Sequence, residues 1–340
     1  MRIVRHWRDV EDDARGAVVA IGNFDGVHLG HRAVIAAAAE VARARGLPLG
    51  VLTFEPHPRA VLGRIDHPFR LTPFRAKAEA IAALGVDILY VAHFDRAFAG
   101  LAPDAFVDEV IVRGLGAAHV VIGYDFAFGA KRGGNIDLLR ARAAAGGYTV
   151  SHVEKAEDEE GAFSASAARR HLEAGDVDAA ARILGRPWEV IGRVRGGDRI
   201  GRTMGFPTAN LAVAKIMRPA PGIYAVWAGI QQAGAHWDTA PDWHPAAAYL
   251  GRRPTFDKTE ELLEAHLLDF DGDIYGRRLR VAFVAHIRGD RKFDGMDDLR
   301  VQIDKDCARA RDILAASRPP GVASGTSADI TAETTSRAIS

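Results

Sequence analysis

Over its first 150 residues the chain alternates short, nearly continuous apolar segments with amphipathic, alanine-rich ones. Apolar segments separated by helical patterns are typical of parallel strands that helices bury on both faces. The pattern predicts strands at 17–21, 49–54, 87–93, 119–123 and 148–153, and helices at 31–45, 73–84, 103–112 and 136–145. Ligands in such folds bind outside the carboxyl ends of the strands, so the loop after the first strand is the first candidate for a site.

The pattern changes after residue 187, where short and often alternating segments are separated by Gly, Pro and Asp clusters. This change indicates an antiparallel sheet or small barrel. The expected strands are 188–195, 223–228, 246–250, 262–270 and 279–287. Two short helices, 166–174 and 177–184, precede this part, and the acidic segment 156–161 is interpreted as a solvated loop.

The chain is therefore expected to be α/β plus β, with a Rossmann-like parallel-sheet domain at 1–185 and a small antiparallel β-barrel domain at 186–316. A length of 340 residues suits two domains of ordinary size. The second domain should end in a helix at about 296–316, in which Leu299, Ile303 and Cys307 share the face that packs on the barrel. Residues 317–340 are rich in Ser, Thr and Ala without periodicity, and we expect a disordered tail.

Charge and cysteine content narrow the partners and the compartment. The 44 basic and 44 acidic residues cancel, which disfavours a broad nucleic-acid-binding surface. Cys307 is the one cysteine, so no disulfide can form within the chain, and this favours a reducing compartment. We expect a cytoplasmic protein without a signal peptide or membrane span. The sequence leaves the oligomeric state open, and a weak homo-oligomer is compatible with it.

The loop after the first predicted strand reads GNFDGVHLGHR at residues 22–32 and leads into a helix. Its glycine spacing does not fit the dinucleotide-binding fingerprint, and no Gly-Lys-Ser/Thr of a P-loop follows. Glycines let the backbone approach phosphate closely, and the N–H groups at a helix start attract anions. His28 and His31 can reach the same anion and stabilise charge on an α-phosphate and on departing pyrophosphate. The alternatives are a helix cap or a metal site, although no third ligand has convincing spacing.

A second glycine-rich segment, RGGDRIGRTMGFPTANL at 195–211, is locally basic. Backbone N–H groups and guanidinium groups both suit phosphate oxygens, although a plain turn is the alternative. Thr208 and Asn210 place two hard oxygen ligands on the same side of an extended segment. That arrangement suits Mg²⁺ bound together with ATP.

The first motif resembles the His-x-Gly-His signature of the nucleotidyltransferase superfamily, and GNFDGVHLGH closely resembles the adenylyltransferase half of bacterial bifunctional riboflavin kinase/FAD synthetases. The stretches TFEPHP, VVIGYDFAFGAKRGG and FSASAARRHLEAGDVDAAARILGRPW match that family in order. The resemblance implies that ATP and its phosphates are bound by His28, His31, Gly22, Asn23, Phe24, Asp25, Gly30 and Ser164, with assistance from Arg169.

The same resemblance assigns Asp125, Phe126 and Phe128 to the nucleotide and FMN pocket. By their residue types alone, Asp125 could equally cap a turn, and the two phenylalanines could equally belong to the core.

The Pro-Thr-Ala-Asn segment resembles that of riboflavin kinases, and PAPGIYAV, LGRRPTF, LEAHLLDFDGDIYGRRLRV and IRGDRKF match farther along. In that family the Glu of Leu-Glu-x-His is the general base, which corresponds to Glu264. Gly201 and Arg202 would bind ATP phosphate. An outward-facing polar pair, Glu264 and His266, is the alternative.

The combined resemblance implies a bifunctional enzyme that uses riboflavin, FMN and ATP with Mg²⁺ and yields FMN and FAD. A single-activity enzyme with one degenerate domain and a non-catalytic flavin-binding regulator are the alternatives. The sequence departs from the family pattern at Ala165, Ala168, Tyr249-Leu250 and Gly289-Asp290. None of these positions is among the expected catalytic or metal-binding residues, so we expect both activities to survive.

Overall fold

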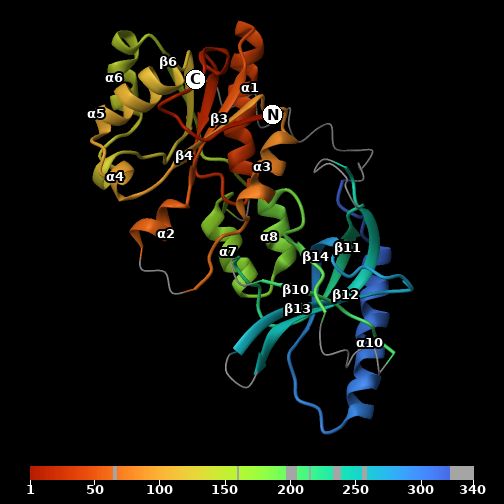
Figure 1. Cartoon of the computed structure of the whole chain (residues 1–340). Coiled ribbons are helices and arrows are strands. Elements are labelled where there is room, and N and C mark those ends of the chain that lie inside the picture. The colour runs from red at the N-terminus through yellow and green to blue at the C-terminus, as the bar shows by residue number, and fades with distance from the viewer. Residues whose placement is uncertain are drawn as a thin grey trace. The chain divides into compact units, whose positions relative to one another are not determined.

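The computed structural model describes residues 1–63, 67–158, 161–196, 205–213, 216–232, 239–254 and 259–321. These residues form two compact units (Figure 1). The first unit contains the described part of Met1–Asp66 together with Phe74–Ser164. The second unit contains His67–Pro73 and the described residues from Ala165 on. None of the helices in these described residues combines the length and the apolar character of a membrane span.

The first unit is built on a parallel sheet whose described strands follow the order β1-β4-β3-β2-β5-β6. The strands are β1 (Arg2–Val4), β2 (Val18–Ile21), β3 (Leu49–Glu55), β4 (Ile88–His93), β5 (His119–Gly123) and β6 (Thr149–Val153). The predicted parallel sheet is therefore confirmed. The sequence did not reveal β1, because its three residues are too few for a periodic pattern and two of them are exposed.

Helices cover both faces of this sheet (Figure 1). They are η1 (Asp12–Ala14), α1 (Leu29–Arg45), α2 (Pro58–Leu62), α3 (Phe74–Ala82), α4 (Arg96–Ala99), α5 (Pro103–Ala105), η2 (Phe106–Leu115), η3 (Ala130–Arg132) and α6 (Ile136–Gly146). Alternate residues of β2 enter opposite cores: Val18 and Ala20 pack with α1 and α3, while Val19 and Ile21 pack with η2 and α6. The regular helix predicted at 103–112 is wrong in detail, because η2 is a π-helix.

The order of the strands identifies where a ligand can bind to the first unit. On one side of β2 lie β3, β4 and β1, and on the other side lie β5 and β6. The strand order therefore reverses between β2 and β5, and in such sheets the crevice at the carboxyl ends of these strands is the usual ligand site. The GNFDGVH loop leaves β2 at this edge, and the loop that carries Asp125 leaves β5.

The acidic segment predicted as a loop contains two short antiparallel strands, β7 (Glu157–Asp158) and β8 (Gly161–Ala162). The loop prediction is therefore wrong for these described residues. Backbone pairing across a short hairpin requires no apolar side chains, so the segment carries no strand pattern.

The second unit contains an antiparallel sheet of described strands in the order β10-β13-β12-β11-β14-β9. They are β9 (Glu189–Arg193), β10 (Ala209–Ala212), β11 (Gly222–Ile230), β12 (Asp242–Pro254), β13 (Thr259–Leu267) and β14 (Arg278–Gly289). An isolated bridge joins the two ends of the sheet, where Arg195 N–H donates to the Asn210 carbonyl at 2.9 Å. This bridge closes the sheet into the predicted small barrel.

Helix α10 (Met296–Ala315) packs on the barrel, as predicted, although Leu299 is only half-buried. Cys307, Ala310 and Leu314 form a buried apolar cluster with residues of the barrel. Ser317 accepts a hydrogen bond from the indole N–H of Trp227 at 3.0 Å. The part of the predicted tail beyond residue 321 lies outside the described residues.

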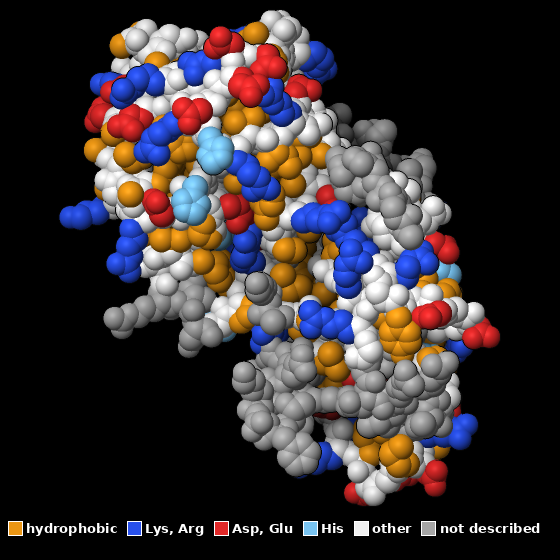
Figure 2. All heavy atoms as spheres, in the orientation of Figure 1, with side chains coloured by type: hydrophobic (Ala, Val, Ile, Leu, Met, Phe, Trp, Pro, Cys, Tyr) orange, Lys and Arg blue, Asp and Glu red, His pale blue; other side chains and the backbone are white. Residues whose placement is uncertain are grey.

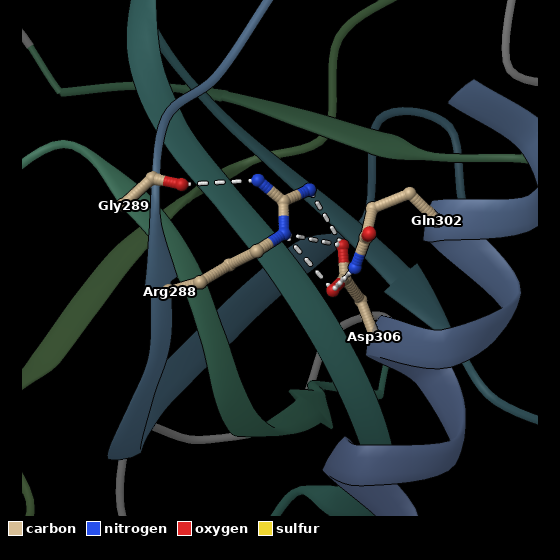
Figure 3. Close-up of polar contacts among 4 residues, drawn as sticks. All are labelled: Arg288, Gly289, Gln302 and Asp306. Atoms are coloured by element: carbon tan, nitrogen blue, oxygen red, sulfur yellow. Dashed lines mark hydrogen bonds and ion pairs between the residues drawn. The ribbon is translucent and has the colours of Figure 1, made fainter. Parts of the chain in front are cut away.

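A bidentate ion pair also holds α10 to β14 (Figure 3). Arg288 donates from Nε and Nη2 to the carboxylate of Asp306, with a shortest distance of 2.7 Å. Gln302 donates to the same carboxylate at 2.8 Å. Asp306 is 4% exposed, so this carboxylate depends on its protein partners rather than on water.

Helices α7 (Ala165–Glu173) and α8 (Val177–Leu184) belong to the second unit, although they precede the predicted domain boundary at residue 185. The segment His67–Pro73 also belongs to the second unit. Three successive carbonyls of this segment accept hydrogen bonds within the unit: Phe69 from Arg169 Nε, Arg70 from Met217 N and Leu71 from Trp188 Nε1.

Charges of both signs are interspersed on the surface of the first unit in the view of Figure 2. This distribution agrees with the balanced net charge of the sequence.

Candidate active sites

The two histidines of the first motif lie side by side at the start of α1. His28 is the N-cap residue, and its Nδ1 accepts a hydrogen bond from the backbone N–H of His31 at 3.3 Å. Their rings are stacked, with centroids 3.6 Å apart and planes inclined by 27°. His28 therefore is a helix cap, which was one alternative, and the cap itself holds the two imidazoles together. Because the two imidazole rings are adjacent at a helix N-terminus, both can bind the same anion.

The loop before these histidines has an unusual backbone. Phe24, Gly26 and Val27 have φ values of 50°, 85° and 45°, in the left-handed region. Phe24 and Val27 are fully buried, and Asp25 is 2% exposed. Left-handed residues with side chains are uncommon and persist where surrounding packing enforces them. Turns of this kind aim backbone N–H groups into anion-binding concavities.

Close packing leaves little room for a side chain at two glycines of the motif. A Cβ on Gly22 would lie 3.2 Å from the ring of Phe24, which in turn packs on His31 with centroids 5.1 Å apart. A Cβ on Gly30 would lie 2.8 Å from the carbonyl oxygen of Phe163. Phe163 and Ser164 begin the second signature of the same unit, so the structure brings the two distant motifs into contact at Gly30.

Arg169 lies on α7 of the second unit and is 8% exposed. Its Nε donates to the Phe69 carbonyl at 2.7 Å, and its guanidinium lies 5.6 Å from the centre of the Phe69 ring. Arg169 thus anchors the segment His67–Pro73 to α7. Its role at the triphosphate remains a prediction.

The predicted flavin residues follow β5 and differ in exposure. Asp125 is exposed, Phe126 is half-buried and Phe128 is 5% exposed. The Phe128 ring packs on Phe106 and Phe126, with centroids 4.9 and 5.9 Å apart, and belongs to the core cluster. Phe128 therefore has the core position that the sequence left open as an alternative, and a flavin contact for these three residues remains a prediction.

The second unit contains a cavity of about 430 Å³ that Thr208 and Asn210 line. Its remaining lining comes mainly from the Pro207–Ala209 segment and from the loop after β13: Val194, Pro207, Ala209, Leu267, Phe270, Asp271, Gly272, Asp273, Ile274 and Tyr275. The predicted Gly201 and Arg202 lie outside the described residues. The two predicted oxygen ligands therefore share a cavity large enough for part of a nucleotide.

Glu264 lies at the same place in the barrel. In the β10–β13 pairing Asn210 is directly opposite Glu264, and in the β12–β13 pairing Tyr249 is opposite Glu264. Side chains of directly opposed residues project from the same face of a sheet. The carboxylate of Glu264, which is half-buried, therefore neighbours the amide of Asn210.

His266 is a site residue whose role the sequence did not reveal. Its Nδ1 lies 2.8 Å from the carbonyl oxygen of Pro207, and its ring meets that of Phe206 edge-on at 5.5 Å. A protonated Nδ1 donates to that carbonyl and holds the residue before Thr208. The shared strand face of Glu264 and His266 was the available signal, but the partner of His266 lies 59 positions away.

Two of the positions that depart from the family pattern contact each other. The hydroxyl of Tyr249 donates to Asp290 Oδ2 at 3.1 Å. A Cβ on Gly251 would lie 2.0 Å from the same hydroxyl, so the Tyr249 side chain runs over Gly251. Tyr249 and Asp290, which both depart from the family pattern, therefore connect β12 to the segment after β14 through their side chains.

The donor set fits Mg²⁺. Within the described part of the chain no group of three His, Cys, Asp or Glu side chains could hold a metal ion. Thr208 and Asn210 both line the cavity, and a threonine hydroxyl and an asparagine amide oxygen are hard neutral donors. Mg²⁺ commonly takes few protein oxygens and completes its shell with nucleotide phosphates and water.

Two family models match the chain: FAD synthetase over residues 10–167 and riboflavin kinase over residues 184–314. A bifunctional riboflavin kinase/FMN adenylyltransferase of Haemophilus influenzae is 36% identical over 92% of this chain and 98% of its own length. One of the same name from Listeria monocytogenes is 39% identical over 88% and 91%. A crystal structure from Streptococcus pneumoniae, described as a macrolide-efflux protein, has a TM-score of 0.81 at 30% identity and covers 92% and 99%.

Proposed function

The chain belongs to the family of bifunctional riboflavin kinase/FMN adenylyltransferases, and we propose how its residues divide the two reactions. ATP phosphorylates riboflavin to FMN, and a second ATP adenylylates FMN to FAD with release of pyrophosphate. The observation that carries the division is that two sites, built around His28 and around Glu264, belong to separate compact units.

Adenylyl transfer uses the loop between β2 and α1. His28 and His31 bind the ATP phosphates and stabilise the charge that develops as FMN phosphate attacks and pyrophosphate departs. The stacking of the two rings at a helix N-terminus supports this assignment. Asp125 and Phe126, which follow the neighbouring strand β5 at its carboxyl end, contact the flavin nucleotide.

Riboflavin phosphorylation uses the cavity of the second unit. Glu264 accepts the proton of the ribityl hydroxyl as that hydroxyl attacks the γ-phosphate of ATP. Thr208 and Asn210 hold Mg²⁺, and His266 orients the segment that carries Thr208. When bound, Mg²⁺ supplies positive charge that offsets the charge on the phosphates. The direct opposition of Asn210 and Glu264 supports placing metal ligand and base in one site.

The family resemblance supports an adenylyltransferase domain at 1–185, a kinase domain at 186–316 and a tail at 317–340, although His67–Pro73, α7 and α8 group with the second compact unit. The reducing compartment inferred from the single cysteine supports the cytoplasm as location. Small molecules are the expected partners, and the balanced charge gives no support to nucleic acid.

The assignment of Glu264 is tested by chromatographic product analysis with riboflavin, ATP and Mg²⁺. The wild-type chain should form FMN and then FAD. Glu264→Gln should lower FMN formation by about a hundredfold or more, because a general base contributes on that order. FAD formation from supplied FMN should persist. Asp269→Asn, which removes a carboxylate exposed on the same barrel, is the matched control and should leave FMN formation unchanged. Rapid FMN formation by Glu264→Gln would refute the assignment.

A further inference from the structure

Lys77 is a buried cation in the first unit whose role no motif explains. It lies on α3 and is 1% exposed. An ammonium group removed from water costs several kcal/mol unless its protons find acceptors. Nζ lies 2.7 Å from Glu55 Oε1, 3.0 Å from Thr53 Oγ1 and 3.1 Å from the carbonyl oxygen of Asn23. The three protons of an ammonium therefore have three acceptors.

These contacts converge on the backbone of the histidine loop. The Thr53 hydroxyl accepts from Lys77 and itself donates to the Asn23 carbonyl at 3.0 Å. Lys77 and Thr53 thus hold the same carbonyl oxygen from two directions. Because Thr53 is completely buried, water does not compete with its hydroxyl for the hydrogen bond to the Asn23 carbonyl.

Holding the Asn23 carbonyl fixes the next amide. Because the peptide group is planar and trans, the N–H of Phe24 points opposite to the Asn23 C=O. Phe24 is also the first left-handed residue of the loop, at φ 50°. Among the described residues its N–H donates to no protein acceptor. The network therefore presents a backbone donor, directed away from Lys77, within the loop that leads to His28.

We propose that Lys77 is a positioning residue for adenylyl transfer: with Thr53 it locks the Asn23–Phe24 peptide so that the Phe24 amide donates to an ATP phosphate. The inference rests on the proposed phosphate-binding role of the His28 loop. A fixed amide contributes most as charge grows on the phosphate, because it needs no reorganisation during the reaction. Lys77 acts through the peptide and does not itself touch ATP.

A pair of substitutions at Thr53 separates positioning from packing. Thr53→Val keeps the volume of the side chain but removes the hydroxyl, whereas Thr53→Ser keeps the hydroxyl and leaves a methyl-sized cavity. Positioning predicts that Thr53→Val lowers kcat for FAD formation from supplied FMN by about tenfold or more. It also predicts that Thr53→Ser stays near the wild-type rate. A packing role predicts that Thr53→Ser is the more damaged variant.

Lys77→Met, which removes the ammonium from a chain of similar length, should lower the same kcat at least as much, with the KM for FMN within about twofold. FMN formation from riboflavin, measured in the same preparations, should be unchanged and reports that the second unit is folded. Far-ultraviolet circular dichroism and thermal melting report whether Lys77→Met is folded, and Thr53→Val carries the test if it is not.

The proposal is overturned if Thr53→Val forms FAD at the wild-type rate, or if Thr53→Ser loses as much activity as Thr53→Val. His28→Ala, assayed in parallel, distinguishes this outcome from a failure of the proposed function. Loss of FAD formation in His28→Ala but not in Thr53→Val refutes the positioning role alone. Normal FAD formation in His28→Ala refutes the phosphate-binding role of the loop.

Discussion

Asn210 on β10 and Glu264 on β13 lie directly opposite each other, at the point where the Arg195–Asn210 bridge closes the barrel. Asn210 is paired through its backbone with Glu264 on one side and with Arg195 on the other. This pairing holds the side chains of Asn210 and Glu264 together, although the two residues are more than fifty positions apart in the sequence. A general base must be positioned relative to the hydroxyl whose proton it accepts, and a rigid barrel does this better than a free loop. The closure of the barrel and the assembly of the proposed kinase site therefore involve the same residue, Asn210.

The first prediction concerns the metal. Thr208→Val retains the shape of a side chain that lines the cavity but removes its oxygen. We expect the Mg²⁺ concentration for half-maximal FMN formation to rise by about tenfold or more. Thr208→Ser retains the oxygen and is the matched control. Magnesium titrations of FMN formation provide the measurement, and equal Mg²⁺ requirements for Thr208→Val and wild type would exclude Thr208 as a ligand.

The second prediction concerns the ion pair between Arg288 and Asp306 (Figure 3). Asp306→Ala leaves a largely buried guanidinium without its carboxylate and should lower the free energy of unfolding of the second unit by roughly 3 kcal/mol. The double variant Arg288→Met/Asp306→Leu should lose less, because it buries no unpaired charge. Urea unfolding followed by the loss of FMN formation measures both. If the double variant is less stable than Asp306→Ala, the explanation through an unpaired charge is wrong.

The third prediction concerns pH. His119 is 5% exposed, and its ring nitrogens lie 2.5 Å from Thr149 Oγ1 and 2.9 Å from Ser151 Oγ. Burial, with a smaller contribution from Arg45, lowers the pKa of His119 from 6.5 to about 4. The unfolded chain therefore binds a proton between these pH values that the folded chain does not. As far as His119 is concerned, the free energy of unfolding is therefore highest above pH 6.5 and declines as the pH falls toward 4.

Between pH 7.5 and 4.5 this decline should amount to roughly 2 kcal/mol in the free energy of unfolding. His119→Gln does not titrate, so the difference between wild type and this variant isolates the histidine from the carboxylates that titrate in the same range. Urea unfolding at the two pH values is the measurement. An identical pH dependence in the two proteins would show that His119 does not titrate as the structure requires.

The sequence predicted the sheets and the closeness of His28 to His31, because those features are local. Strand periodicity and a spacing of three residues at a helix start are written in neighbouring positions. The η2 π-helix was not visible, because its apolar pattern is compatible with an ordinary helix. Strand β10 was seen only as an extended segment, because its identity depends on pairing with β13.

The burial of Lys77 is a feature that could not be predicted from the sequence. In the sequence it is a charged residue of an amphipathic helix, for which an exposed position is the usual expectation. Its burial depends on acceptors at positions 23, 53 and 55, which tertiary structure brings together. The contact between His266 and Pro207 could not be predicted either. The pattern of residues on β13 does not reveal that His266 binds the carbonyl of Pro207.

Mixing two defective variants tests whether the two sites in one chain work independently. His28→Ala should convert riboflavin to FMN and stop, whereas Glu264→Gln should convert supplied FMN to FAD but not use riboflavin. An equimolar mixture of the two variants with riboflavin, ATP and Mg²⁺ should therefore form FAD, because FMN released by one protein is a substrate for the other. If each variant alone loses both activities, or if the mixture accumulates FMN without forming FAD, the two sites do not work independently.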